Sequence, residues 1–194
     1  MNTAIYDKES DEELIRLVAA GDEASLARLV DRYQRAVFST ILRYLGSSTD
    51  VEDLAQDVFA SVWQNARRFE GRSKFSTWLY RIVVNRCLKH RRKHRIAVES
   101  LDEAGEEAPV PEQLTVEFNQ RFEQERKSRI VNQAISELPE RQRLALILTR
   151  FEGKSYQEAG EIMGVSLSAI ESLVLRAREN LAKRLEPLRA QGVI

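Results

Sequence analysis

The residues best suited to chemistry lie in one stretch, 69–95, where aromatic and basic side chains come together. Its aromatic residues crowd the first half, and Lys and Arg dominate the second half, against a single acid, Glu70. Aromatic rings can stack on unpaired bases, at about 1–3 kcal/mol per base, and a row of cations can hold a phosphate backbone. The stretch therefore predicts a surface for single-stranded nucleic acid; the alternative is a core helix with a solvated basic face.

The spacing of this stretch predicts a helix that is buried on one side. From Phe75 onwards, apolar residues recur at helical intervals. Polar residues fall four, four and three positions apart and would share the other face: Arg81, Asn85, Lys89 and Arg92. We expect a helix with one apolar and one basic face, preceded by an aromatic loop over residues 69–75.

A metal site is a second chemistry that this stretch could support. Cys87, His90 and His94 stand at i, i+3 and i+7 and could share one face of the helix. A structural zinc site needs a fourth ligand, and the surrounding Lys and Arg would repel a dication. We therefore predict no metal site, with Cys87 in the core and the histidines near phosphate.

Catalysis is a third possibility, and the sequence offers little for it. Asp53 and Asp57 would lie one helical turn apart on an exposed helix, without the burial that tunes a general acid or base. No arrangement typical of a nucleophilic triad or a nucleotide-phosphate loop accompanies them. We expect no enzyme, no cofactor and no small-molecule substrate.

Composition favours an all-α fold. The 194 residues are 43% hydrophobic and 31% charged and include only 8 Gly and 4 Pro, which suits helices around a sizeable core. One cysteine excludes an internal disulfide and fits a reducing compartment. No apolar segment approaches the length of a membrane span, and no signal peptide is visible, so we expect a cytoplasmic protein.

The net charge of zero conceals a strong segregation of charge along the chain. Residues 1–66 have 6 basic and 12 acidic side chains, whereas residues 67–95 have 11 basic and one acidic. Residues 96–128 have 3 against 9, and residues 129–194 have 10 against 8. Blocks of opposite charge imply different partners for different parts of the chain.

Helical periodicity divides the chain into two helical domains, residues 10–95 and 114–187. Between them, residues 96–113 are acidic and contain Pro and Gly, which is typical of a flexible linker. Its acids are either solvated or mimic a nucleic-acid backbone inside a basic channel. Three capping boxes mark predicted helix starts: Ser10 with Glu13, Thr49 with Glu52, and Ser155 with Glu158.

The second domain ends in a predicted helix-turn-helix. A short helix at 156–163 is followed by a turn at Gly164, and Ser166 or Ser168 caps a longer helix that reaches about residue 185. Gly160 would let the two helices approach closely. Basic residues follow along the second helix: Arg176, Arg178, Lys183 and Arg184. The motif predicts binding in a DNA major groove; the alternative is a hairpin used only for packing.

The two domains together resemble the extracytoplasmic-function (group 4) sigma factors of bacterial RNA polymerase. Four stretches in order carry the resemblance: AGDEASLARLVDRYQRAVF (20–38), DVEDLAQDVFASVWQNARRF (50–69), FEGRSKFSTWLYRIVVNRCLKHRRK (69–93) and LPERQRLALILTRFEGKSYQEAGEIMGVSLSAIESLVLRARENL (138–181). The resemblance implies an all-α protein in which sigma domain two, a four-helix bundle, is joined to sigma domain four.

The resemblance also implies contacts for the first domain. Its acidic helix would bind the β′ clamp helices of core polymerase through Asp50, Asp53, Gln56, Asp57 and Trp63. Residues 69–75 would capture a flipped base of the minus-ten element, and the helix that follows would line the melted strand. The residues expected there are Phe69, Lys74, Phe75, Trp78, Arg81, Asn85, Lys89 and Arg92.

The second domain would bind the β flap and read the minus-thirty-five element. The residues expected at this DNA are Ser166, Ser168, Ala169, Glu171, Ser172, Leu175, Arg176 and Arg178. The chain departs from the family here, because Ala169, Glu171 and Leu173 stand where Thr and basic residues are common. Glu171 could accept a hydrogen bond from cytosine N4, or it could be a helix-start acid favoured by the macrodipole.

The family resemblance implies control by an anti-sigma factor and a monomer when no partner is bound. The rival hypothesis is a free-standing helix-turn-helix regulator whose first domain serves effector binding or dimerisation. That hypothesis predicts specific duplex binding by the protein alone, and it gives no role to aromatics beside the basic stripe.

Overall fold

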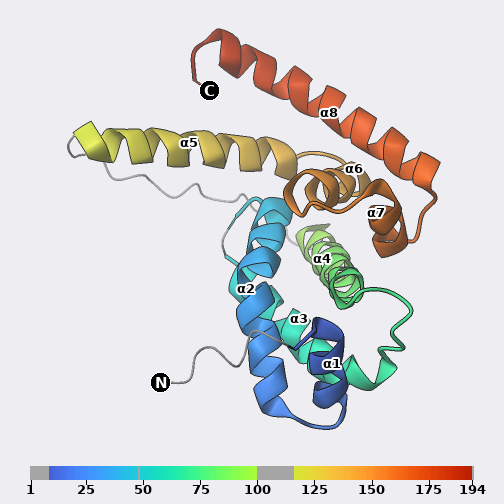
Figure 1. The fold of residues 1–194 in the computed structure, drawn as a ribbon. Coiled ribbons are helices and arrows are strands. Elements are labelled where there is room, and N and C mark those ends of the chain that lie inside the picture. The colour runs from blue at the N-terminus through green and yellow to red at the C-terminus, as the bar shows by residue number, and fades with distance from the viewer. Residues whose placement is uncertain (1–8, 48, 100–115, 194) are drawn as a thin grey trace.

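The computed structural model describes residues 9–47, 49–99 and 116–193, and the side chains of residues 9–47, 49–93 and 126–193. Within these ranges every element is helical, which confirms the all-α class (Figure 1). No helix in this part of the chain has the length and apolar character needed to cross a bilayer.

An N-terminal bundle contains four helices: α1 (Asp11–Ala19), α2 (Glu23–Leu45), α3 (Val51–Asn65) and α4 (Phe75–Glu99), with a short 3-10 turn (Ala66–Arg68) after α3. The capping box predicted for α1 is confirmed, because the backbone N–H of Glu13 donates to Ser10 Oγ at 3.2 Å and Ser10 N–H donates to Glu13 Oε2 at 2.8 Å. As predicted, α2 ends at Gly46, whose φ of 81° is left-handed.

Two predicted boundaries in this bundle are wrong. Asp50, not Thr49, is the N-cap of α3, and it makes no side-chain capping bond. The helix α4 continues to Glu99, so the first four residues of the predicted linker are helical. The rest of that linker, residues 100–113, lies outside the described residues.

A C-terminal bundle contains α5 (Val116–Ser136), α6 (Glu140–Leu146), a π-helical turn (Ile147–Phe151), α7 (Tyr156–Met163) and α8 (Leu167–Ala190). The predicted helix-turn-helix is α7 and α8, with a left-handed turn at Gly164. A Cβ at Gly160 would lie 2.9 Å from the Val165 carbonyl oxygen, so a larger residue would crowd the turn. The second helix runs five residues further than predicted.

The two bundles pack directly against each other, and their buried apolar residues form one continuous core (Figure 1). Arg143 of α6 is fully buried at this junction. Its Nη1 donates to the Tyr44 carbonyl at 2.6 Å, and its Nη2 donates to the Leu138 carbonyl at 2.8 Å. A Cβ at Gly46 would lie 2.4 Å from Ser136 Cβ, so only glycine fits this approach of α2 to α5.

Candidate nucleic-acid interface

An aromatic cluster forms at the start of α4, next to the loop that the sequence predicts to bind a base. Phe69 lies 5.6 Å from Trp78 and 6.3 Å from Phe75 between ring centroids, and Tyr33 of α2 packs on Phe75 at 5.4 Å. Phe69 and Trp78 are half-buried and present part of their rings at the surface. These two rings are therefore accessible for stacking on bases.

Phe75 is a correction to the predicted set. Its side chain is only 1% exposed, so it is a core residue and cannot stack on a base. Its backbone N–H begins α4 and donates to Glu12 Oε1 at 2.9 Å. Glu12 was missed from the sequence because it lies 63 residues earlier in the chain. Phe75 therefore supports the rings of Phe69 and Trp78 from the core side.

The predicted basic stripe is present on α4, but one end of it contacts the C-terminal bundle. Asn85, Lys89 and Arg92 are exposed. Arg81 is half-buried, and its Nε donates to the backbone carbonyl of Glu161 in α7 at 3.0 Å. Lys74, which precedes α4, forms an ion pair with Glu158 of α7 at 3.2 Å. The helix-turn-helix thus lies against one end of the stripe.

Two further contacts at this boundary were not predicted. The hydroxyl of Tyr80 donates to Glu152, and burial together with this hydrogen bond raises the pKa of Tyr80. Lys154 donates to Ser76 Oγ at 3.1 Å and lies over the Tyr80 ring. Burial lowers the pKa of Lys154. No local pattern marks these residues, because their partners are more than 70 positions away.

The acidic helix α3 presents the side chains predicted to bind polymerase. Asp53, Gln56, Asp57 and Trp63 are exposed, with Trp63 at 37%. Asp50 is half-buried and lies 3.5 Å from Nε2 of His90 on α4.

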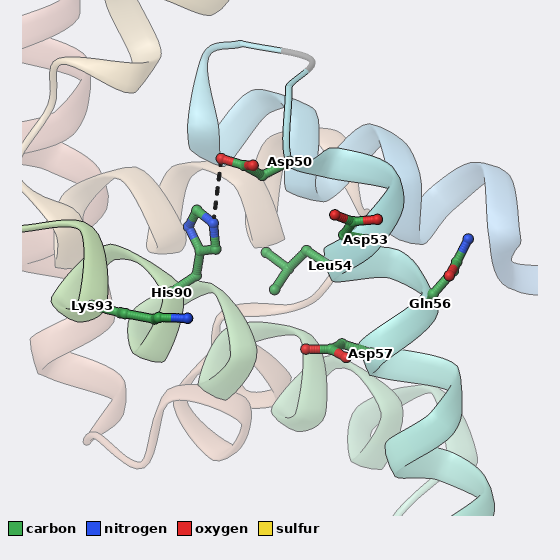
Figure 2. Close-up of a pocket in the computed structure, with 7 residues that line it drawn as sticks. All are labelled: Asp50, Asp53, Leu54, Gln56, Asp57, His90 and Lys93. Atoms are coloured by element: carbon green, nitrogen blue, oxygen red, sulfur yellow. Dashed lines mark ion pairs between the residues drawn. The ribbon is translucent and has the colours of Figure 1, made fainter. Parts of the chain in front are cut away.

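A hollow of about 520 Å³ lies between α3 and the second half of α4. Its lining residues are Asp50, Asp53, Leu54, Gln56, Asp57, His90 and Lys93. Figure 2 shows Asp50 and His90 directed toward each other, with the other two acids further along α3. The wall from α3 is acidic, and Lys93 adds a cation from α4.

The first turns of α8 carry the residues predicted for major-groove contact. Ser166 is the N-cap, since its Oγ accepts from the Ala169 N–H at 3.3 Å, and Ser168 Oγ lies 3.1 Å from it. Leu173 is half-buried against the core, and so is not a candidate contact. The exposed members of the set are Ser166, Ser168, Glu171, Ser172, Leu175, Arg176 and Arg178, whereas Ala169 is half-buried.

The side chains that the structure describes contain no group of three potential metal ligands. Cys87 is fully buried, as predicted, and burial raises the pKa of its thiol to about 12. His90 faces Asp50, and the side chain of His94 lies outside the described residues.

Comparison with known proteins identifies both bundles. The family described as Sigma-70 region 2 matches residues 29–96, and the one described as Sigma-70, region 4 matches residues 128–181. The RNA polymerase sigma-H factor of Pseudomonas aeruginosa is 32% identical over 186 residues, which cover 93% of this chain and 96% of that protein. The ECF RNA polymerase sigma-E factor of Escherichia coli K12 is 34% identical over 191 residues, 92% of this chain and 96% of that protein.

Solved structures agree on the fold. The structure of CnrH in complex with the cytosolic domain of CnrY matches with a TM-score of 0.66 and 24% identity, covering 92% of this chain and 99% of that one. The sigma factor RpoE of Bartonella quintana, solved with the anti-sigma factor NepR, matches with a TM-score of 0.66 and 26% identity, covering 82% of this chain and 96% of that one. Since the sequence matches run along nearly the whole chain and include both sigma regions in order, this protein belongs to the extracytoplasmic-function sigma factors of the sigma-70 family, which are alternative factors for transcription initiation.

Proposed function

We propose that this chain binds core RNA polymerase, holds the melted minus-ten strand on its N-terminal bundle and reads the minus-thirty-five element with its C-terminal bundle. The observation that carries this proposal is that a basic helix beside half-exposed aromatics and an exposed helix-turn-helix occur in one chain that matches both sigma regions. The match along nearly the full length favours this function over a free-standing regulator.

Polymerase binding is assigned to the outer face of α3. The acids of this helix are exposed, and residues 1–66, which include it, carry a net charge of −6. This charge suits a basic partner surface. Trp63 adds an exposed aromatic side chain, a residue type that is enriched at the centre of protein interfaces. The β′ clamp helices are the proposed partner of this face, and the β flap is the proposed partner of the C-terminal bundle.

Strand capture is assigned to a strand-binding face on α4 and the loop before it. We define this face by its residues: Phe69, Lys74, Trp78, Arg81, Asn85, Lys89 and Arg92. Phe69 and Trp78 would stack on unpaired bases, and the cations would hold phosphates. Flipping a base costs a few kcal/mol, which stacking and phosphate contacts can offset.

Duplex recognition is assigned to the exposed start of α8. Ser168, Glu171, Ser172 and Leu175 would face base edges, while Arg176 and Arg178 would contact phosphates. The N-terminus of α8, capped by Ser166, also favours a phosphate through its unpaired N–H groups.

Control by an anti-sigma factor is part of the proposal. The RpoE structure with NepR shows that a relative with 26% identity binds such a protein, and the acidic face of α3 is the surface that an inhibitor would need to cover. The proposal also includes action in the cytoplasm as a monomer, without a cofactor or catalytic activity; membership of the family supports this part of it.

The test is run-off transcription with purified core polymerase and a mixed genomic template, with and without this protein. Discrete transcripts that require the protein are expected, and their start sites give both promoter elements. Trp78→Ala and Asn85→Ala should reduce open-complex formation about tenfold or more while core binding is unchanged, because a stacked base and a strand contact are lost.

Trp63→Ala is the matched control for Trp78→Ala, since it should weaken core binding and leave promoter opening intact at saturating protein. If Asn85→Ala and Trp63→Ala lowered core binding equally, the assignment of two separate faces would be wrong. Absence of transcripts, together with specific duplex binding by the protein alone, would point to a free-standing regulator.

A further inference from the structure

Helix α1 contacts both ends of the loop that is proposed to capture a base, residues 69–75, which we call the capture loop. At the end of this loop, the backbone N–H of Phe75 donates to Glu12 Oε1, in the first turn of α1, at 2.9 Å. Just before its start, Arg67 Nε donates to the carbonyl oxygen of Ala19 at 3.2 Å. Ala19 is the last residue of α1. One short helix therefore holds the capture loop at two points.

The bond to Phe75 supplies an acceptor that the neighbouring sequence lacks. The first N–H groups of a helix have no partner inside the helix and often bond to the side chain of the residue just before it. That residue is Lys74 in α4, and an ammonium group can donate but cannot accept. Glu12 provides the acceptor from 63 positions earlier in the chain. Because a carboxylate is a strong acceptor, this bond fixes where α4 begins.

A second contact of α1 reaches the ring of the same phenylalanine. Asp11, which precedes Glu12, accepts a hydrogen bond from the Tyr33 hydroxyl, and it also accepts from Arg32 Nη1 at 2.7 Å. The Tyr33 ring lies 5.4 Å from the Phe75 ring between centroids. The backbone of Phe75 is thus held through Glu12, and its ring is held through Tyr33.

The two rings that are proposed to stack on bases pack on this residue. Phe69 lies 6.3 Å and Trp78 lies 6.0 Å from Phe75 between ring centroids. Between the two held ends of the capture loop, residues 70–72 are exposed. A loop binds more tightly when its bound shape is already set, because less conformational freedom is lost on binding. The contacts with α1 therefore govern how well a flipped base fits.

We propose that Glu12 is a positioning residue for the minus-ten contact and that α1 holds the capture loop in its binding position. Glu12 acts through Phe75 and makes no contact with DNA. It sets the start of α4 so that Phe69 and Trp78 meet the flipped base. This inference rests on the proposed function and adds to it a residue that determines base specificity from outside the strand-binding face.

The test starts from a promoter that the wild-type holoenzyme uses in run-off transcription, with its minus-ten positions randomised. The transcripts from this library give the preference for each base at each position. Glu12→Ala should lower the preference at one minus-ten position about three- to tenfold, because a hydrogen bond that fixes the loop is lost. The affinity for core polymerase should be unchanged, since the outer face of α3 is untouched.

Two further variants separate positioning from a general loss of structure. Glu12→Gln keeps a side-chain oxygen of the same reach, so its base preference should stay within about twofold of the wild type. Glu13→Ala is the matched control on the same helix. Glu13 is exposed, and its Oε2 accepts from Ser10 N–H at 2.8 Å. Its loss weakens the start of α1 but removes no bond to α4, so the melting temperature should fall and the base preference should remain.

Arg67→Ala tests the other end of the capture loop. Arg67 is exposed, so its substitution should cost little stability. The variant loses the bond to the Ala19 carbonyl and should lower the same base preference. If Arg67 only contacted a phosphate, its loss would instead weaken all sequences alike and lower the slope of affinity against salt by about one. That result would contradict the inference.

A measurement on the free protein reports the loop without polymerase. The chain has two tryptophans, so in a Trp63→Phe background the emission comes from Trp78 alone. Glu12→Ala should shift this emission to the red and increase its quenching by acrylamide, because the ring loses its support at Phe75. Glu12→Gln and Glu13→Ala should leave both quantities as they are in the background protein.

The outcomes distinguish this inference from the proposed function. Wild-type base preference in Glu12→Ala, or an equal loss in Glu12→Ala and Glu13→Ala, would overturn the inference and leave the proposed function standing. If Glu12→Ala did not fold, Arg67→Ala would decide, and an unchanged base preference there would overturn the inference. Absence of transcripts with the wild-type chain would disprove the proposed function, and this inference with it.

Discussion

At the scale of single residues, burial decides how the chemistry-bearing side chains are used. Phe75 and Cys87 share stretch 69–95 with the exposed cations, yet both lie in the core. Burial favours the neutral form of an acid, and this is why the pKa of the Cys87 thiol rises from 9.0 to about 12. Cys87 is therefore a packing residue whose ionisation is linked to folding.

This linkage predicts a stability difference at alkaline pH. The unfolded chain loses the thiol proton above pH 9 while the folded chain keeps it to about pH 12, so the stability present below pH 9 is lost across that window. Between pH 8 and pH 10 the wild type should lose about 1.4 kcal/mol more of its unfolding free energy than Cys87→Ala. Urea titrations at both values measure this, and parallel losses in the two proteins would contradict it.

At the scale of elements, the proposed function gives α4 and α8 two different ways of binding nucleic acid. The strand-binding face combines stacking rings with cations, which suits unpaired bases irrespective of sequence. The exposed start of α8 has an acid, two apolar side chains and serines before its arginines, which suits reading of base edges followed by phosphate contact. The two helices should therefore respond differently to substitution.

For α8 we predict that Glu171→Gln changes which base pair is preferred at one minus-thirty-five position, because in the proposed readout the carboxylate would accept a hydrogen bond from cytosine N4. Arg176→Ala should instead weaken all sequences alike and lower the slope of affinity against salt by about one. Transcription by the holoenzyme from a promoter library randomised at this element measures both. An unchanged preference with Glu171→Gln would show that this acid serves only the helix dipole.

At the scale of the whole molecule, Arg143 joins the two bundles into one folding unit. Its guanidinium bonds the Tyr44 carbonyl 99 positions earlier and lies 5.1 Å from the Tyr44 ring centroid. Burial lowers its pKa to about 10. Since the hydrophobic core is continuous across this junction, both bundles should unfold together.

We expect one calorimetric transition for the wild type and two for Arg143→Leu. The substitution leaves the carbonyls of Tyr44 and Leu138 without a partner, at a cost of about 1–3 kcal/mol each. Arg141→Leu, at an exposed position on the same helix, is the control and should keep the single transition. Two transitions in the wild type would show that the bundles are independent.

Local patterns in the sequence were enough to find the helices and the motifs. Capping boxes at Ser10 and Ser155, and helix stops at Gly46 and Gly164, depend on contacts within a few residues, and all four are present. Phe75 could be assigned from sequence either to the aromatic loop or to the apolar face of α4. Packing with Tyr33 and Phe69 settled its place in the core.

The sequence by itself determined the all-α class, the order of the helices, the stripe on α4 and the helix-turn-helix, because helical periodicity and capping act over short distances. The tertiary structure alone decided that Arg143 is buried, that Glu12 caps α4, and that Arg81 meets Glu161. These contacts join residues 63 to 99 positions apart. Such pairs are set by how the helices pack in three dimensions, within the N-terminal bundle for Glu12 and between the bundles for Arg143 and Arg81, and the spacing of residues along the chain does not encode that packing.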